Sequence, residues 1–144
     1  MNRPPVVLDP SDIPAIAVDS MNRTHHEEVA LVNALGELIK AAQQGDQDAE
    51  AMDAALDEWV AHTEAHFARE NELMEKYGFP PYPVHAQEHA TVLEEIHRLQ
   101  SQWHRDRQTG PLTDFLFQRW PQWFMMHVNT MDTITAQFLS AHID

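Results

Sequence analysis

Three short clusters of helix-breaking residues divide this sequence into four segments. The clusters are QQGDQD at residues 43–48, GFPPYP at residues 78–83 and RQTGP at residues 107–111. They interrupt helices because Gly favours helix ends and Pro lacks the backbone N–H that a helix needs. Between the clusters, apolar residues recur at every third or fourth position, and strand-like alternation is absent. The sequence therefore predicts an all-α protein with four helices.

Each of the four segments carries one stripe of residues at helical spacing. The stripes run from Met21 to Ile39, from Met52 to Tyr77, from His85 to Leu99 and from Phe124 to Phe138. The last segment covers residues 112–141, and Pro121 inside it should break or kink the helix. Short connections between such helices favour an up-down-up-down four-helix bundle. We therefore expect an N-terminal extended arm at residues 1–18, which is rich in Pro, and the bundle at residues 19–144.

The composition fits a single domain and excludes several classes of function. The chain has 144 residues and a formal net charge of −14, which argues against nucleic acid and anionic membranes as partners. No apolar run approaches the roughly 20 residues of a transmembrane helix, and the Pro-broken start lacks the apolar stretch of a secretory signal. We therefore expect a cytoplasmic protein. Cys is absent, so disulfides, thiolate nucleophiles and Cys-based metal sites are excluded.

Histidine is the unusual component of this composition, with ten residues. Every expected helix has His on its stripe, and buried imidazoles are costly unless something satisfies them. The His residues in question are His25, His66, His85, His89 and His127. Glu70 follows His66 by four positions, so that the two share one helix face. Polar ligands from four helices would meet in the bundle core, where such bundles hold metals and cofactors.

Two other metal-site patterns compete for some of these residues. The stretch HAQEH at residues 85–89 matches the H-x-x-E-H motif of inverzincin proteases, in which Glu88 would be the base between two zinc ligands. This interpretation leaves the His residues of the other helices unexplained. A ferritin-like di-iron carboxylate site needs two Glu-x-x-His motifs, and Glu94–His97 is the single match. The sequence is rich in His where that class is rich in Glu.

The ordered set of motifs resembles the hemerythrin family. That family has a His on the first helix, HxxxE on the second, HxxxH on the third and HxxxxD on the fourth. The corresponding stretches here are HHEEVALVN, HFARENELM, HAQEH and HVNTMD, within residues from about 16 to 140. His25 fits the first position better than His26, because it lies on the stripe and at the right spacing from Asn33. Many family members have an Ile-Asp-x-Gln-His run here, whereas this chain has MNRTHH.

The resemblance implies a non-haem di-iron centre with a solvent-derived oxo or hydroxo bridge. It assigns His85, His89 and His127 to one iron, His25 and His66 to the other, and Glu70 and Asp132 to both as bridging carboxylates. Imidazole and carboxylate ligands suit both ferrous and ferric iron. Five His and two bridges leave one iron a ligand short, and this open position is where O2 would bind.

The resemblance therefore implies an O2-binding protein for carriage, storage or delivery, rather than an enzyme. The alternative is a redox enzyme, or a sensor of O2, redox state or iron, that uses the same centre. The expected partner is O2, and an oxygen-consuming enzyme or a signalling protein is a further candidate. Reversible binding is favoured because the remaining carboxylates are expected mostly on outer faces, where they cannot supply protons to the pocket. The expected pocket lining is Phe67, Trp123, Met125, Met126 and Met131.

Some residues close to these motifs are expected to stay outside the site. His26 points about 100° away from His25, and its neighbours Glu27 and Glu28 are expected to face solvent with it. His62 lies a full turn before His66, and no motif of the family includes it, so we expect it not to bind metal.

The fourth helix poses a geometric problem. His127 and Asp132 are five residues apart, which on a regular α-helix separates them by about 140° around the axis. A π-type turn brings residues five apart closer to one line, and such turns favour functional sites. We therefore expect a π-type turn between Phe124 and Asp132.

Overall fold

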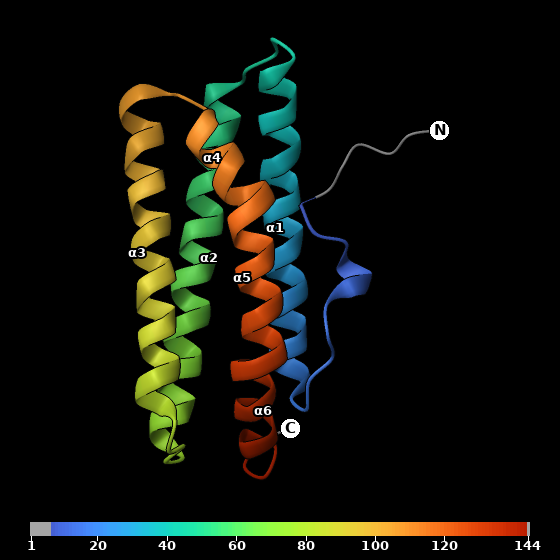
Figure 1. Ribbon diagram of the computed structural model, residues 1–144, viewed down its shortest axis with the longest axis vertical. Coiled ribbons are helices and arrows are strands. Elements are labelled where there is room, and N and C mark those ends of the chain that lie inside the picture. The colour runs from blue at the N-terminus through green and yellow to red at the C-terminus, as the bar shows by residue number, and fades with distance from the viewer. Residues whose placement is uncertain (1–6, 144) are drawn as a thin grey trace.

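Four long helical segments lie side by side and run alternately in opposite directions (Figure 1). The structure is a computed structural model, which describes residues 7–143. Its first three long helices are α1 (Asp19–Gln43), α2 (Ala49–Lys76) and α3 (Tyr82–Asp106). Within residues 7–143 there is no β-strand, and no helix there is both long and apolar enough to cross a membrane. The all-α up-down-up-down bundle expected from the sequence is confirmed.

The fourth segment of the bundle is one continuous helix made of five pieces. In chain order they are α4 (Gly110–Asp114), η2 (Phe115–Arg119), α5 (Trp120–His127), η3 (Val128–Asp132) and α6 (Thr133–Leu139). Both η2 and η3 are single π-helical turns, which are wider than an α-helical turn. Pro121 is the second residue after η2, and the wider turn relieves the clash between its ring and the preceding backbone. The helix is therefore not broken at Pro121.

Local sequence signals set several of the helix ends. Asp48 caps α2, because its side chain accepts a hydrogen bond of 3.0 Å from the Ala51 backbone N–H. Gly78 follows α2 with a φ of 71°, a left-handed conformation that costs Gly little. Arg107 adopts a similar φ of 58° directly after α3. These ends allow the chain to reverse, so that consecutive helices pack antiparallel.

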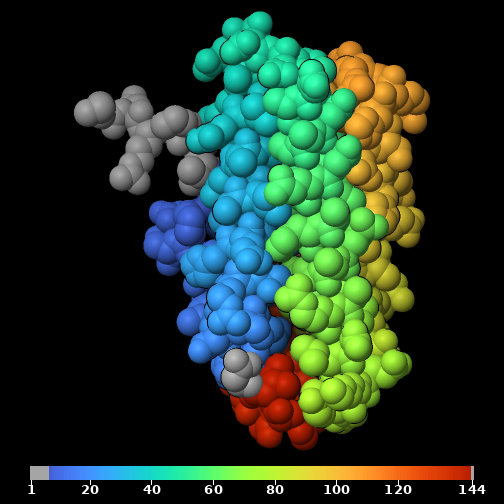
Figure 2. Space-filling view, turned by 180° about the vertical axis from the view of Figure 1, so that it is seen from behind, coloured from blue at the N-terminus to red at the C-terminus, as the bar shows by residue number. Residues whose placement is uncertain are grey.

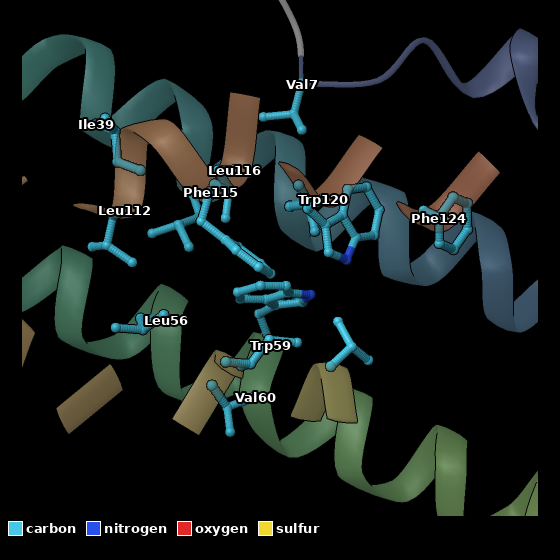
Figure 3. Close-up of a cluster of buried hydrophobic side chains, with 14 of the residues drawn as sticks. Val7, Ile39, Leu56, Trp59, Val60, Leu112, Phe115, Leu116, Trp120 and Phe124 are labelled. Carbon is cyan, nitrogen blue, oxygen red and sulfur yellow. The ribbon is translucent and has the colours of Figure 1, made fainter. Parts of the chain in front are cut away.

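An aromatic cluster fills the core between α2 and the fourth segment (Figure 3). The ring centroid of Trp59 lies 6.3 Å from that of Phe115 and 6.4 Å from that of Trp120. Trp120 stacks on Phe124 at 4.6 Å, and Phe124 meets the ring of His25 edge-on at 5.6 Å. Such aromatic pairs stabilise a core beyond the area that they bury. The apolar core thus continues up to the ring of His25.

The described part of the N-terminal arm, residues 7–18, runs along α1, on the side away from α2 in the rear view (Figure 2). Asn33 of α1 fastens it: its Oδ1 accepts the Val7 N–H at 2.9 Å and the Leu8 N–H at 3.1 Å, and its Nδ2 donates to the Leu8 carbonyl at 2.9 Å. Val7 also packs over Gly36, where an added Cβ would come within 2.7 Å of Val7 Cγ2. Residues 1–6 of the expected arm lie outside the described residues.

Replacing Asn33 with Ala should release the arm from α1. The change removes three hydrogen bonds, each worth about 1 kcal/mol, so we expect the free energy of unfolding to fall by about 1–3 kcal/mol. Hydrogen exchange of the Val7 and Leu8 amides measures the release directly, because both lose their acceptor. Asn129→Ala is the matched control, since exposed Asn129 bonds a carbonyl of its own helix. Unchanged protection of the two arm amides would contradict the role given to Asn33.

Candidate metal centre

Seven polar side chains meet in the interior of the bundle, and each is at most 4% exposed. They come from all four long segments and are the residues that the sequence singled out: His25, His66, Glu70, His85, His89, His127 and Asp132. The pairs on α2 and α3 point the same way because residues four apart lie one turn apart on one face. The seven form two overlapping groups that share Glu70, and within each group the candidate ligand atoms lie within 4.8 Å of one another.

The first group contains three imidazoles and two carboxylates. The Nε2 atom of His127 lies 3.1 Å from that of His85 and 3.2 Å from that of His89. Asp132 Oδ1 is 3.2 Å from Nε2 of both His85 and His127. Glu70 Oε1 is 3.4 Å from Nε2 of His89. Three ring nitrogens and two carboxylate oxygens thus surround one small volume.

The second group contains His25 and His66 together with Glu70. His66 Nε2 lies 2.7 Å from Glu70 Oε2, and His25 Nε2 lies 3.0 Å from Asp132 Oδ2. Each carboxylate therefore turns one oxygen toward the two-His group and the other oxygen toward the three-His group. A carboxylate that bridges two metal ions needs this division.

The donor atoms fit metal ions better than they fit one another. Nδ1 of His89 lies 2.9 Å from Asn71 Oδ1, and Nδ1 of His127 lies 2.6 Å from Glu88 Oε1, so both Nδ1 atoms donate. A neutral imidazole has one N–H, so the Nε2 atoms that face each other then carry lone pairs. Two carboxylate oxygens in the same space, one each from Glu70 and Asp132, are buried without a hydrogen-bond partner. Protons or metal ions must lie between these atoms.

The outer nitrogens of the rings are held by neighbouring side chains. His85 Nδ1 lies 2.8 Å from Thr135 Oγ1, whereas His25 Nδ1 is buried without a partner. Contacts of this kind fix the tautomer and the orientation of a metal-binding ring. Glu88, the acid of the HAQEH stretch, supports His127 in this way instead of standing between two zinc ligands.

Glu28 is the residue of the site that sequence reasoning missed. The expectation that it faces solvent is wrong, because it is 2% exposed. Its Oε1 lies 2.9 Å from His62 Nδ1 and 3.3 Å from His66 Nδ1. Two further side chains donate to its Oε2, namely Trp59 and Thr63. The signal that could have revealed it is its position three residues after His25, on the same face of α1.

His62 lies outside both groups of candidate ligands. Its Nε2 is 3.4 Å from Oε1 of Glu27, whose side chain is 66% exposed, while its Nδ1 faces Glu28. Contacts therefore run from the surface through Glu27, His62 and Glu28 to His66. His26 is exposed, as expected.

A small enclosed cavity lies against His66 and Asp132. Its volume is about 10 Å³, which is close to the minimum for one water-sized molecule. Four of its nine lining residues are aromatic, namely Phe67, Trp120, Trp123 and Phe124, and the polar residues Glu28, Thr63 and His127 complete the wall with His66 and Asp132. The expected lining is right for Phe67 and Trp123 and wrong for the three Met residues. Met126, for example, is 70% exposed.

The π-helical turn η3 brings His127 and Asp132 to the same interior volume. The N–H of Thr133 reaches the carbonyl of Val128, five residues earlier, and Thr133 Oγ1 donates to the same carbonyl at 2.7 Å. The π-type turn expected between Phe124 and Asp132 is confirmed. It solves the problem that the five-residue spacing poses on a regular α-helix.

Two of the imidazoles are protonated on both nitrogens, and therefore positively charged, in the metal-free protein. Burial opposes this charge, but the Glu70 carboxylate and the hydrogen bonds that His66 donates to Glu28 and Glu70 raise the pKa of His66 to about 10. Burial is likewise outweighed at His127, whose contact with Asp132 raises its pKa to about 9. Both pKa values exceed the ordinary 6.5, so this contribution to stability is full below pH 6.5 and is lost as the pH rises through 9 and 10.

Metal loading of the metal-free protein should release protons, because an ion takes the Nε2 positions of His66 and His127. At pH 7.5 we expect at least about two protons per chain, one from each of these rings. A pH indicator dye in weakly buffered solution counts the protons as zinc or ferrous ion is added under argon. Loading without proton release would contradict the protonation described for the two rings.

Comparison with known proteins gives a consistent result. The model of a family described as the hemerythrin HHE cation binding domain matches residues 16–139. A bacteriohemerythrin of Aquifex aeolicus is 28% identical over 134 residues, which are 93% of this chain and 98% of that protein. A bacteriohemerythrin of Stenotrophomonas maltophilia is 29% identical over 131 residues, which are 90% of this chain and 79% of that protein.

A shorter match has a higher identity. A bacteriohemerythrin of Ralstonia nicotianae is 37% identical over 90 residues, which are 60% of this chain and 62% of that protein. No solved structure matches the chain. The family model nevertheless spans nearly the entire bundle, including all seven side chains that converge in its core. The chain therefore belongs to the hemerythrin family.

Proposed function

We propose that the seven converging side chains hold two iron ions joined by a solvent-derived oxo or hydroxo bridge, and that this centre binds O2 reversibly. The proposed ligands are His85, His89 and His127 for one iron, His25 and His66 for the other, and Glu70 and Asp132 as bridges. Family membership favours iron, and imidazole with carboxylate suits both of its common oxidation states. When bound, the iron pair supplies the electrons for O2 binding.

The division of the carboxylate oxygens is the observation that carries this proposal. Glu70 turns Oε2 toward His66 and Oε1 toward His89, and Asp132 turns Oδ2 toward His25 and Oδ1 toward His85. One ion alone would leave one oxygen of each carboxylate directed at an imidazole with nothing between them. Two ions use both oxygens of both carboxylates.

The unequal number of imidazoles indicates which side takes O2. With the bridges shared equally, the two-His side has one protein ligand fewer than the three-His side. The cavity is lined by His66 of the two-His side and by His127 of the three-His side, so it lies beside both proposed ion positions. Part of its wall consists of rings such as Phe67 and Trp123, which offer no strong hydrogen-bond partner toward it.

The buried carboxylate of Glu28 bears on whether O2 is released or consumed. Glu28 lines the cavity, contrary to the expectation that the spare carboxylates lie on outer faces. Burial opposes its ionisation, but hydrogen bonds from His62 and His66 lower the pKa of Glu28 to about 2. At neutral pH the group is therefore an acceptor with no proton of its own to give. This supports reversible binding over consumption of O2.

A redox enzyme that uses the same centre is the second candidate function. The specific observation in its favour is the line of contacts from exposed Glu27 through His62 and Glu28 to His66. The hydrogen bond with Glu28 outweighs burial and raises the pKa of His62, so this ring is a proton donor near the surface. Reduction of O2 or peroxide needs such a supply of protons, whereas reversible binding does not.

Glu70→Ala should lower the iron content from two ions per chain to one or none, because both proposed ions share this carboxylate. His62→Gln is the control and should retain two ions, since His62 lies outside both groups of candidate ligands. Iron per chain is measured with a colorimetric chelator on purified, reconstituted protein. Two tightly bound ions in the Glu70 variant, or fewer than two in the His62 variant, would contradict the proposed ligand set.

The reduced, iron-loaded protein should bind one O2 per iron pair and release it again. Stopped-flow spectroscopy on the anaerobic protein should show an O2 adduct, and flushing with argon should restore the diferrous spectrum over several cycles. If each addition of O2 instead yields the oxidised protein and free peroxide within one cycle, the carrier function fails and the redox enzyme replaces it.

A further inference from the structure

Glu28 is a carboxylate of the centre that belongs to neither group of candidate ligands. It is 2% exposed, and its two oxygens are contacted by four side chains from α2. Those side chains are Trp59, His62, Thr63 and His66. A buried carboxylate is costly unless its oxygens are satisfied in this way. Its retention in the core calls for a role that an apolar residue of similar size could not fill.

The hydrogen bonds of Glu28 determine which nitrogen of His66 carries hydrogen. An ionised carboxylate only accepts, so each of its partners must donate. Oε2 takes the indole N–H of Trp59 and the hydroxyl of Thr63. Oε1 remains for Nδ1 of His62 and of His66, at 2.9 Å and 3.3 Å. His66 is thereby held with hydrogen on Nδ1, and its Nε2 faces Glu70 and the proposed metal position.

The other imidazole on the same side of the centre has no such support. His25 Nδ1 is buried without a hydrogen-bond partner within residues 7–143. On the three-His side, His127 has a carboxylate neighbour in Glu88, whose side chain is 31% exposed and therefore more screened by water than Glu28. Glu28 is thus the buried carboxylate that accepts a hydrogen bond from a proposed ligand on the two-His side.

We propose that Glu28 is a positioning residue that holds His66 in its Nδ1–H form and makes Nε2 a stronger electron donor. This inference rests on the proposed function, because it assigns the metal on the two-His side to His66. A carboxylate behind a ligating imidazole raises the basicity of the ligand and favours the more highly charged metal ion. Glu28 therefore strengthens iron binding on this side and stabilises the ferric state.

Glu28→Gln is the decisive variant, because it keeps the volume of the side chain. If the Gln carbonyl oxygen accepts from Trp59 and Thr63, its NH2 group faces His66 Nδ1 and can only donate. The hydrogen on Nδ1 then has no acceptor, and the tautomer with hydrogen on Nε2 is favoured. Metal binding on the two-His side should therefore weaken, without loss of any proposed ligand.

The expected effect is a 10-fold to 100-fold weaker affinity for one of the two irons, the range typical of lost hydrogen bonds to a ligating imidazole. Competition with a ferrous chelator on the reconstituted protein should show one weakened and one unchanged ion. The ferric–ferrous equilibrium should also shift about tenfold toward ferrous, which is about 59 mV for a one-electron couple. A potential is the stronger test, since a purely structural role for Glu28 would not shift it.

Two matched variants complete the experiment. Glu88→Gln makes the same change behind His127 and should weaken the other iron of the pair instead. His62→Gln leaves the contact between Glu28 and His66 in place, so the affinities and the potential should stay as in the wild type. If Glu28→Gln leaves both affinities and the potential unchanged, or if His62→Gln reproduces its effects, the inference is wrong.

A measurement on the wild-type protein covers the case in which the Glu28 variant does not fold. In protein labelled with 15N-histidine and loaded with zinc, long-range nitrogen–proton correlation spectra identify the protonated nitrogen of each ring. His66 should show a slowly exchanging, downfield-shifted hydrogen on Nδ1. Zinc bound through Nδ1 of His66, or an Nδ1 hydrogen that exchanges freely, would overturn the inference.

The two levels of hypothesis fail in different ways. If the wild-type protein does not bind two ions, the proposed function fails whatever the Glu28 variant does. If the wild type binds two ions and Glu28→Gln behaves identically, the inference about Glu28 fails alone. Loss of one tight ion together with the shift in potential supports both.

Discussion

The interior of this bundle is governed by the repulsion of like polar atoms in a volume that water barely reaches. His89 and His127 donate outward through Nδ1, so in two neutral rings the Nε2 atoms, 3.2 Å apart, would face each other with lone pairs. The rings cannot turn away, because their outer partners hold them. A proton or a metal ion must stand between them. The stability of this half of the molecule is therefore linked to what the centre binds.

The other half of the core packs without any such requirement, and Trp59 joins the two halves. Its ring lies edge-on to Trp120 in the aromatic cluster, while its indole N–H donates to Glu28. One side chain thus takes part in apolar packing and in orienting a candidate ligand. Because Glu28 also contacts His66, the tightly packed aromatic core helps to fix the orientation of this ring in the polar centre.

Helical periodicity was sufficient to predict the four helices and to place the five His residues and Glu70 on their stripes, whereas Asp132 was predicted from the resemblance to the hemerythrin family. A pair such as His66 and Glu70 needs no knowledge of the other helices, since a spacing of four residues places both on one face. Periodicity failed to predict burial where the burial of a side chain depends on a neighbouring helix or on an irregular turn. Glu28 looks solvated beside Glu27, and its burial depends on partners from α2. Met126 looks like a pocket residue, but η2 and η3 shift the faces of the fourth helix away from a regular period.

The contact between His25 and Asp132 joins residues that lie 107 positions apart in the chain. An ion shared by both would close a loop of that length, and so restrict the unfolded chain as a covalent cross-link does. The same separation means that His25 is synthesised long before Asp132. While the ribosome is still adding the fourth helix, the first three can pack, but the two-His side lacks Asp132. The centre therefore stays incomplete until the fourth helix has been synthesised through Asp132 and docks.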